Sequence, residues 1–320
     1  MPLVDQESSI PAISVLLPVY NGMPYLRTSL ESVLGQSFIN FELLIVDDGS
    51  KDGSWEYLLS CEDKRIVTYR NESNKGLFYN LNFLLQKSKA PLFKLWAQDD
   101  VMYPQCLQSF VHFAEDHPGM GFIYSGRDII DENNAIITPG DIDDTPPVIS
   151  TELHARIAFF TGSIAGNIAN VCLVKSALNE VGLFNMDMKI SADFDMWVRL
   201  AKNHQTGFIS EKLIQLRDHK GQLSRREDFY LNHVREDLIV YRNLLSYVTS
   251  EQKKEGAALL RKHKFVYYYT LMVKTMLKGN IKKGYLFYKE LSAMDNFLSL
   301  SVSFVKAKLG SAPRPVVKNS

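Results

Sequence analysis

The chain has 320 residues, of which 46% are hydrophobic and 22% charged, and its 36 Lys and Arg residues balance 36 Asp and Glu residues. This length predicts one large or two ordinary domains, and the composition excludes a disordered chain, a collagen-like chain and a disulfide scaffold. Cys61, Cys106 and Cys172 lie far apart without CxxC spacing, which predicts reduced thiols in a reducing compartment and excludes a zinc site built from cysteines.

Segments with the patterns of buried strands and of amphipathic helices alternate through the first hundred residues. A strand buried on both faces has a continuous apolar run, whereas a helix has apolar residues three or four positions apart. In chain order these segments are a strand at 13–17 that ends at Pro18, a helix at 23–34 that ends at Gly35, a strand at 41–46, a helix capped by Ser50 or Asp52, a strand at 65–70, a helix at 77–86 and a strand at 92–97.

This alternation predicts an α/β fold with a mostly parallel sheet flanked by helices. In such sheets ligands bind beyond the carboxyl ends of the strands, so we expect the site at residues 18–21, 47–50 and 98–100. The later segments predict a strand at 121–124, a loop or flap at 139–147, mostly helical structure at 230–298 and a frayed tail at 311–320.

The balanced net charge conceals a difference between two parts of the chain. From Phe229 onward there are 16 Lys and Arg against 6 Asp and Glu, whereas the preceding residues hold 20 against 30. Such an asymmetry suggests different partners and a boundary near residue 228. We therefore expect an α/β domain at 1–228, a basic helical region at 229–310 and a flexible tail at 311–320.

The basic region interleaves lysines with aromatic side chains between Lys262 and Lys289. Helices of this kind can make peripheral contact with an anionic membrane, with the lysine stems snorkelling and the rings at the interface. The alternative is a helical hairpin with its rings in the core and its lysines in water. Nucleic-acid binding would explain the basic region but not the acidic first part.

The sequence predicts a cytoplasmic protein, with peripheral contact at the inner face of the cytoplasmic membrane as an extension of that prediction. No apolar run reaches the ~18 residues that span a bilayer. Asp5 and Glu7 stand where a secretory signal peptide would be basic, so secretion is not expected.

Two pairs of acidic residues follow predicted strands. Asp47 and Asp48 end one strand, and Asp99 and Asp100 end another. Four carboxylates at one edge of a sheet repel each other unless a cation lies among them. A divalent cation such as Mg²⁺ or Mn²⁺ with a diphosphate satisfies this requirement, because both prefer oxygen ligands. The alternative is that each pair is a solvated turn, since Asp favours turns.

The segments that carry these acids resemble family 2 glycosyltransferases, enzymes of the GT-A fold that transfer sugars from nucleotide-sugars. The resemblance rests on ISVLLPVYNGMPYLRTSLESVLGQSFINFELLIVDDGSKDGS, then NKGLFYNLNFLL, WAQDDVMYP, VGLFNMDMKISADFDMWVRLA and RDHKGQLS, in that order. It covers roughly residues 10–225 and implies a GT-A catalytic domain within residues 1–228.

The resemblance implies that one pocket holds the nucleotide. In it Tyr20 would pack on the base, and Asp48 would accept a hydrogen bond from it, which suits a pyrimidine. Lys75 would lie where a loop approaches the nucleotide, with a solvated loop residue as the alternative. The residues implied for the pocket are Pro18, Tyr20, Asn21, Asp47, Asp48, Lys75 and Asp99.

The resemblance also implies a divalent metal, Mg²⁺ or Mn²⁺, at the acids of the WAQDD segment. Asp100 would be the main ligand, while Asp99 would contact the ribose or the metal. Ala97 stands where the commoner form of the motif has a further acid. His219, in the RDHKGQLS segment, would reach the metal or a phosphate oxygen, with a surface loop residue as the alternative.

The general base implied by the resemblance is Asp193. An acceptor hydroxyl must lose its proton as it attacks the sugar, and a nearby carboxylate can take that proton. The segment SADFDMW is similar to the family's E-D-x-D-L-W, with Ala192 in place of the Glu. The alternative is that Asp193 only favours a helix N-terminus through capping and the helix dipole.

These features together predict an inverting, metal-assisted glycosyltransferase. Its donor would be a nucleoside-diphosphate sugar, with UDP favoured by the resemblance, and its acceptor a hydroxyl of a glycan or a lipid-linked molecule. Another nucleotide-binding α/β enzyme is disfavoured because GxGxxG and GxxxxGK[ST] are missing. The remaining alternative is a catalytically degenerate sugar- or nucleotide-binding protein of the same fold.

Overall fold

The computed structural model describes residues 10–138, 144–219, 221 and 229–309. Contacts between residues divide the chain into two compact units that are not consecutive along the sequence. The first contains residues 1–149, 167–184 and 203–219, and the second contains residues 150–166, 185–202 and 220–320. The domain boundary expected at residue 228 stays a prediction.

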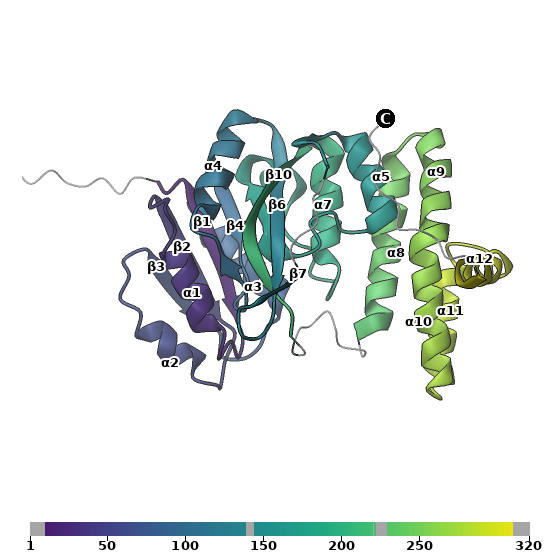
Figure 1. The fold of residues 1–320 in the computed structure, drawn as a ribbon, viewed down its shortest axis with the longest axis horizontal. Helices are drawn as coiled ribbons and strands as arrows, with labels where there is room; N and C mark the ends of the chain where they lie inside the picture. The colour runs from purple at the N-terminus through teal and green to yellow at the C-terminus, as the bar shows by residue number, and fades with distance from the viewer. Residues whose placement is uncertain (1–9, 139–143, 220, 222–228, 310–320) are drawn as a thin grey trace, which may run out of the picture. The chain divides into compact units, whose positions relative to one another are not determined.

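The first unit is built on a ten-stranded sheet with the main order β3-β2-β1-β4-β9-β6-β10-β5 (Figure 1). Its strands are β1 (Ile13–Val19), β2 (Phe41–Asp47), β3 (Ile66–Arg70), β4 (Leu92–Leu95), β5 (Val101–Met102), β6 (Met120–Ile130), β7 (Ile136–Thr138), β8 (Val148–Ile149), β9 (Val171–Val174) and β10 (Gln205–Arg217). Its helices are α1 (Leu26–Leu34), α2 (Ser54–Leu59), α3 (Leu77–Lys87), α4 (Cys106–Asp116) and α6 (Lys175–Val181), with a 3₁₀ turn η1 (Ile168–Asn170).

The predicted α/β fold is confirmed, and its parallel part follows from the apolar runs. β3, β2, β1 and β4 pair in parallel, and α1 lies over one face of them (Figure 1). The side chains of β1, β2 and β4 are buried almost throughout, which explains why their sequences are nearly continuous runs of hydrophobic residues. Their carboxyl ends therefore meet at one edge, where the acidic pairs follow.

The prediction that β1 ends at Pro18 is wrong, because Pro18 pairs opposite Val46 inside the strand. Leu16 accepts a hydrogen bond from Trp96 on the β4 side, whereas Val19 accepts one on the β2 side. Alternate residues of a parallel strand face alternate neighbours, so Pro18 faces β4, which ends before reaching it. The missing N–H of proline leaves no ladder hydrogen bond unmade there.

The rest of the sheet is mixed. β9 lies antiparallel between β4 and β6, while β10 runs parallel to β6 and carries β5 and β8 as antiparallel neighbours. The strand expected at 121–124 extends over Met120–Ile130. β9 and β10 had not been predicted, because one has four residues and the other mixes polar and apolar side chains. The flap expected at 139–147 falls partly on residues outside the described ones.

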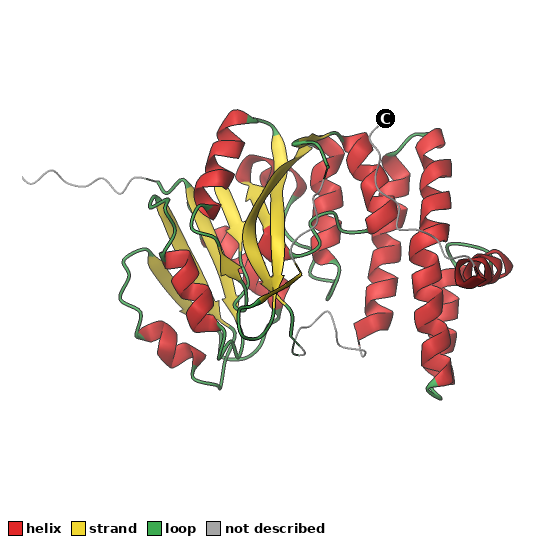
Figure 2. Cartoon of the chain, viewed as in Figure 1, coloured by secondary structure: helices red, strands yellow, loops and turns green. Residues whose placement is uncertain are grey.

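The second unit consists of helices in its described residues (Figure 2). The mostly helical structure expected at 230–298 is confirmed. The helices are α5 (Thr151–Thr161), α7 (Ala192–Asn203), α8 (Tyr230–Tyr247), α9 (Ser250–Leu260), a π-helical turn η4 (Arg261–Phe265), α10 (Val266–Leu277), α11 (Ile281–Ser292) and α12 (Phe297–Leu309).

Two glycines shape the hairpin of α10 and α11. Gly279 has a φ of +85° and lies between the helices, where a left-handed residue ends α10. Gly284 lies inside α11 and is buried. A Cβ there would come within 2.3 Å of the Met276 side chain, so the glycine permits close packing of the two helices. In the part of the chain that the structure describes, every helix is too short or too polar to traverse a bilayer.

Candidate active site

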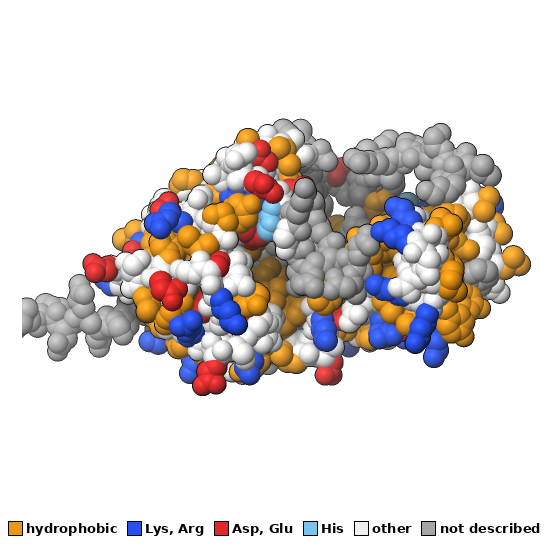
Figure 3. Space-filling view, turned by 90° about the horizontal axis from the view of Figure 1, so that it is seen from below, with side chains coloured by type: hydrophobic (Ala, Val, Ile, Leu, Met, Phe, Trp, Pro, Cys, Tyr) orange, Lys and Arg blue, Asp and Glu red, His pale blue; other side chains and the backbone are white. Residues whose placement is uncertain are grey.

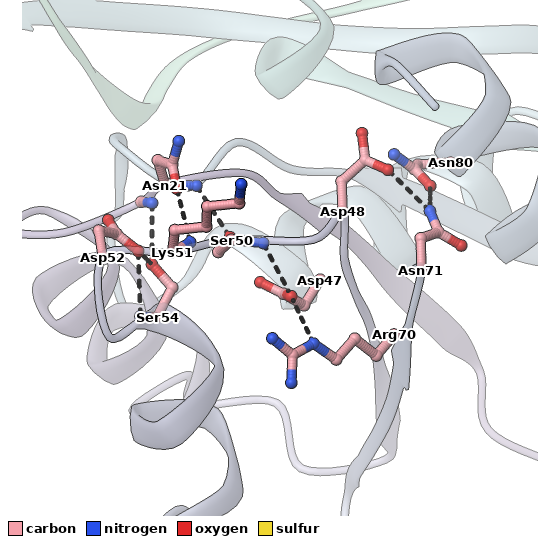
Figure 4. Close-up of polar contacts among 11 residues, drawn as sticks. Asn21, Asp47, Asp48, Ser50, Lys51, Asp52, Ser54, Arg70, Asn71 and Asn80 are labelled. Carbon is pink, nitrogen blue, oxygen red and sulfur yellow. Dashed lines mark hydrogen bonds and ion pairs between the residues drawn. The ribbon is translucent and has the colours of Figure 1, made fainter. Parts of the chain in front are cut away.

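The loop after β1 is fixed to the loop after β2 by consecutive hydrogen bonds (Figure 4). The backbone N–H of Asn21 donates to Ser50 Oγ at 2.9 Å, and the side-chain Oδ1 of Asn21 accepts from the N–H of Lys51 at 2.9 Å. The next two N–H groups donate to Ser54 Oγ and to Asp52 Oδ2. Asn21 adopts a left-handed φ of +48°, which costs energy and is common at functional sites.

Tyr20 is held at this edge by a side chain from the segment that follows β4. The residue is 47% exposed. Its backbone N–H donates to Gln98 Oε1 at 2.8 Å, and its carbonyl accepts from Gln98 Nε2 at 3.1 Å. Gln98 lies three residues beyond the end of β4 and directly before Asp99 and Asp100, so it fixes the end of β1 relative to the segment that carries these acids.

Asp47 and Asp48 are both buried and have different contacts. Asp47 Oδ2 accepts from the N–H of Ser50 at 3.1 Å and lies 3.4 Å from Arg70 Nε (Figure 4). Asp47 Oδ1 is buried without a hydrogen-bond partner in the described structure. The pair is therefore not a solvated turn.

Asp48 holds the loop that leads into α3. Its Oδ1 accepts from Asn71 Nδ2 and from the N–H of Lys75, both at 2.8 Å, and its Oδ2 accepts from the N–H of Gly76 at 3.0 Å. Asn71 Nδ2 also donates to Asn80 Oδ1 at 2.7 Å. The side chain of Lys75 is exposed, whereas its backbone is tied to Asp48.

The acids after β4 meet the end of β10. Asp99 Oδ2 lies 2.8 Å from His219 Nε2, and the His219 ring packs on Tyr25 with 5.1 Å between ring centroids. Asp100 is buried, and its Oδ1 accepts from the N–H of Arg217 at 2.9 Å. Its Oδ2 is buried without a partner among the described groups.

Burial raises the pKa of Asp100 well above its usual value, and the charge of Asp99 adds to this effect. The charges of Lys94 and Arg217 act in the opposite direction, although the Arg217 guanidinium itself donates to backbone carbonyls, from Nε to that of Asp99 at 2.7 Å and from Nη1 to that of Asp131 at 2.7 Å. A buried carboxylate with one free oxygen is the kind of group that a cation would stabilise.

Asp193 lies in the second unit, at the start of α7. Its Oδ1 accepts from the N–H of Phe194 at 2.7 Å. Burial raises its pKa to about 6, with a further increase from Asp237 and a decrease from His233. The apolar side chains that follow it on α7 are buried: Trp197, Val198, Leu200 and Ala201.

The structure thus groups the predicted residues of the first unit at one edge of its sheet. One group contains Pro18, Tyr20, Asn21, Asp47, Asp48 and Lys75, and the other contains Asp99, Asp100 and His219. Among the described residues, no three His, Cys, Asp or Glu side chains form a preassembled metal cluster. Gln98 links the two groups, and both it and Arg217 were missed although they lie inside the WAQDD and RDHKGQLS segments.

The chain was compared with known proteins. Residues 14–172 match the model of glycosyl transferase family 2. An uncharacterized glycosyltransferase of Rickettsia felis is 28% identical over 245 residues, which are 76% of this chain but only 39% of that relative.

Two solved structures resemble the fold. TarS of S. aureus (1–349), in complex with UDP-GlcNAc, matches with a TM-score of 0.62 and 17% identity over 94% of this chain and 93% of that chain. The mannosyltransferase PcManGT of Pyrobaculum calidifontis, in complex with GDP-Man and Mn²⁺, has a TM-score of 0.53 and 11% identity over 92% of this chain and 87% of its own. The chain therefore belongs to glycosyl transferase family 2 and has the GT-A fold, as its motifs predicted.

Proposed function

We propose that this protein transfers a sugar from a nucleoside-diphosphate sugar, with UDP as the favoured nucleotide, to a hydroxyl of a glycan or lipid-linked acceptor. The observation that carries the proposal is the edge of the sheet in a family 2 domain, where Asp100 keeps a buried free oxygen beside the Asp99–His219 pair. The UDP-GlcNAc complex of TarS supports a UDP-sugar donor.

The nucleotide would bind at the loop after β1. The exposed ring of Tyr20 offers a face for the base, and Gln98 fixes its backbone in place. Asp48 already accepts three hydrogen bonds from the 71–76 segment, and an ionised carboxylate has about four lone-pair sites. We therefore assign to it the positioning of this loop together with one remaining bond to the base. Pro18, Asn21 and Asp47 would shape the pocket, and Lys75 would contribute its exposed cationic side chain.

The residues after β4 fit a divalent cation. Asp100 and Asp99 would hold Mg²⁺ or Mn²⁺, with His219 as a further ligand, and diphosphate oxygens and water would complete the shell, as Mg²⁺ prefers. The free, buried Oδ2 of Asp100 is the observation that favours this assignment. When bound, the cation neutralises charge that develops on the leaving diphosphate.

Asp193 would be the general base that takes the proton of the acceptor hydroxyl. Direct attack assisted by one base gives inversion at the sugar. A pKa near 6 leaves the carboxylate ionised at neutral pH and more basic than an ordinary Asp. A catalytically degenerate binding protein remains the alternative, because Ala97 and Ala192 replace two acids of the family's motifs.

The donor can be identified by thermal shift with UDP-GlcNAc, UDP and GDP-mannose, each with and without Mn²⁺. A ligand at 100 times its dissociation constant stabilises the native state by about 2.7 kcal/mol. We expect the UDP compounds to raise the melting temperature and Mn²⁺ to increase the rise. UDP release in the presence of an acceptor separates an enzyme from a binding protein. If no nucleotide-sugar changes the melting temperature, the proposed donor is wrong.

The basic helices 262–289 are proposed to contact an anionic membrane at the inner face of the cytoplasmic membrane. Much of this segment agrees with the alternative, a helical hairpin with its rings in the core, because Tyr268, Met272 and Phe287 are buried. At the turn between α10 and α11, however, Leu277 and Ile281 are 82% and 62% exposed. Lys and Arg side chains lie beside hydrophobic ones on the C-terminal helices (Figure 3), which suits lipid headgroups with shallow insertion.

We expect the full chain to sediment with phosphatidylserine vesicles at low salt and to be released as salt rises, because each Lys near the surface contributes about 1 kcal/mol. The double variant Leu277→Asp and Ile281→Asp should stay in the supernatant. As a control, Lys253→Glu and Lys254→Glu change exposed charges on α9 and should leave sedimentation largely intact. If the unmodified chain never sediments, these helices do not bind membranes.

A further inference from the structure

Two buried carboxylates lie on α8, in the second unit and in the basic part of the chain. Glu236 is 6% exposed and Asp237 is 5% exposed. Burying a carboxylate is costly unless hydrogen bonds or charges compensate, so both side chains need partners in the surrounding structure.

Glu236 holds the turn that precedes α7. Its Oε1 accepts from the N–H of Lys189 at 3.0 Å, and its Oε2 accepts from the N–H groups of Ile190 at 2.8 Å and Ser191 at 2.9 Å. Hydrogen bonds to an ionised acceptor are stronger than neutral ones. Three of them on consecutive residues fix the backbone two positions before Asp193.

Asp237 joins the same turn to α8 and α10. Its Oδ1 accepts from Ser191 Oγ at 2.6 Å, and its Oδ2 accepts from the hydroxyl of Tyr268. His233, one turn earlier on α8, places its Nε2 3.4 Å from the same Oδ2. Ser191 in turn accepts the N–H of Asp195 through its carbonyl, so the contact continues into the first turn of α7.

We infer that Asp237, held by Ser191, His233 and Tyr268, is a positioning residue for Asp193, and that α8 and α10 thereby belong to the catalytic apparatus. The inference deepens the proposed function and rests on the role of Asp193 as the base. Asp237 acts through the turn before α7 and through its charge, without contacting the acceptor.

The electrostatic contacts agree with this arrangement. The charge of Asp237 adds to burial in raising the pKa of Asp193, whereas a protonated His233 acts in the opposite direction. On α7 itself, Asp195 is paired with Arg199 at 2.8 Å. The other groups around the cluster that interact with Asp237 are Tyr241 of α8, Lys264 of η4, and Tyr267 and Tyr268 of α10.

The coupling can be measured without a substrate. The difference in melting temperature between a protein and its Asp193→Asn form changes with pH around the pKa of Asp193. The pH at which half of this change has occurred is the midpoint. In an Asp237→Asn background we expect the midpoint to move to lower pH by about one unit, the scale of an interaction between nearby charges. In a His233→Gln background it should move to higher pH. Glu255→Gln, which changes an exposed residue of α9, should leave the midpoint unchanged.

Rates then connect the coupling to catalysis, with UDP release from UDP-GlcNAc as the assay. We expect the acidic limb of the pH profile of kcat/KM to shift to lower pH in Asp237→Asn and to higher pH in His233→Gln. Asp237→Asn should also lower kcat with little change in KM for the donor. If the midpoint moves in neither the Asp237→Asn nor the His233→Gln background while Asp193→Asn is inactive, the inference about Asp237 is overturned, and Asp193 is still supported as the base. If the midpoints move while Asp193→Asn keeps full transfer, the proposed base is wrong instead.

Discussion

An Asp100→Asn variant is expected to lose sugar transfer by a factor of ~10³ or more, because a metal ion contributes several kcal/mol to charge stabilisation in such reactions. The substitution retains an oxygen that can accept the N–H of Arg217, so the main change is the loss of a charge. Burial and Asp99 raise the pKa of this carboxyl, so a cation must displace a proton from it. We therefore expect Mn²⁺ affinity of the unmodified protein to fall as pH falls.

The measurement is Mn²⁺ titration followed by thermal shift, with UDP-GlcNAc present, and transfer in excess EDTA as a second readout. Asp116→Asn, which removes an exposed acid at the end of α4, serves as the control and should behave like the unmodified protein. Full activity of Asp100→Asn, or undiminished transfer in EDTA, would show that Asp100 does not hold a metal.

An Asp193→Asn variant is expected to lower turnover by a factor of ~10²–10⁴, the usual contribution of a general base, while donor binding stays nearly unchanged. Asn has the same shape and can still accept the N–H of Phe194, but it cannot take a proton. Steady-state rates with a matched donor titration test this. A collapse of donor affinity with retained turnover would place Asp193 in the donor site or at a helix cap.

The Asp193→Asn variant is also expected to become more stable than the unmodified protein as pH rises. Burial raises the pKa of Asp193 to about 6, so the folded state favours the protonated form, and the ionised carboxylate destabilises it above pH 6. Below about pH 4 the group is protonated in folded and unfolded states, and the penalty disappears. We expect Asp193→Asn to be more stable by about 1–3 kcal/mol at pH 7 than the unmodified protein, relative to their difference at pH 4.

Asp187→Asn provides the matched control for this stability measurement, because Asp187 is an exposed acid in the same segment. Its stability relative to the unmodified protein should vary little between pH 4 and 7. If Asp193→Asn shows an equally flat difference, the carboxyl of Asp193 is well solvated and its pKa is close to that of an ordinary Asp.

The predominantly apolar runs at 13–17, 41–46 and 92–97 predicted the parallel part of the sheet, because strands covered on both faces require hydrophobic side chains at successive positions. The same pattern located the acids at the strand ends. The order of motifs then predicted the family. The mixed half of the sheet was not predictable, since β9 is too short for a clear pattern and its pairing depends on strands far away in sequence.

The contacts in the candidate site also depend partly on the sequence and partly on the tertiary structure. The sequence supplied the acids and His219, but only the tertiary structure showed that Asp99 meets His219 across 120 positions and that Gln98 holds Tyr20 across 78. Within the second unit, no local sequence pattern distinguishes Glu236 from the other charged residues of its helix. Packing of α8 against the turn before α7 makes it a buried acceptor, and burial of that kind depends on contacts between segments that no local pattern encodes.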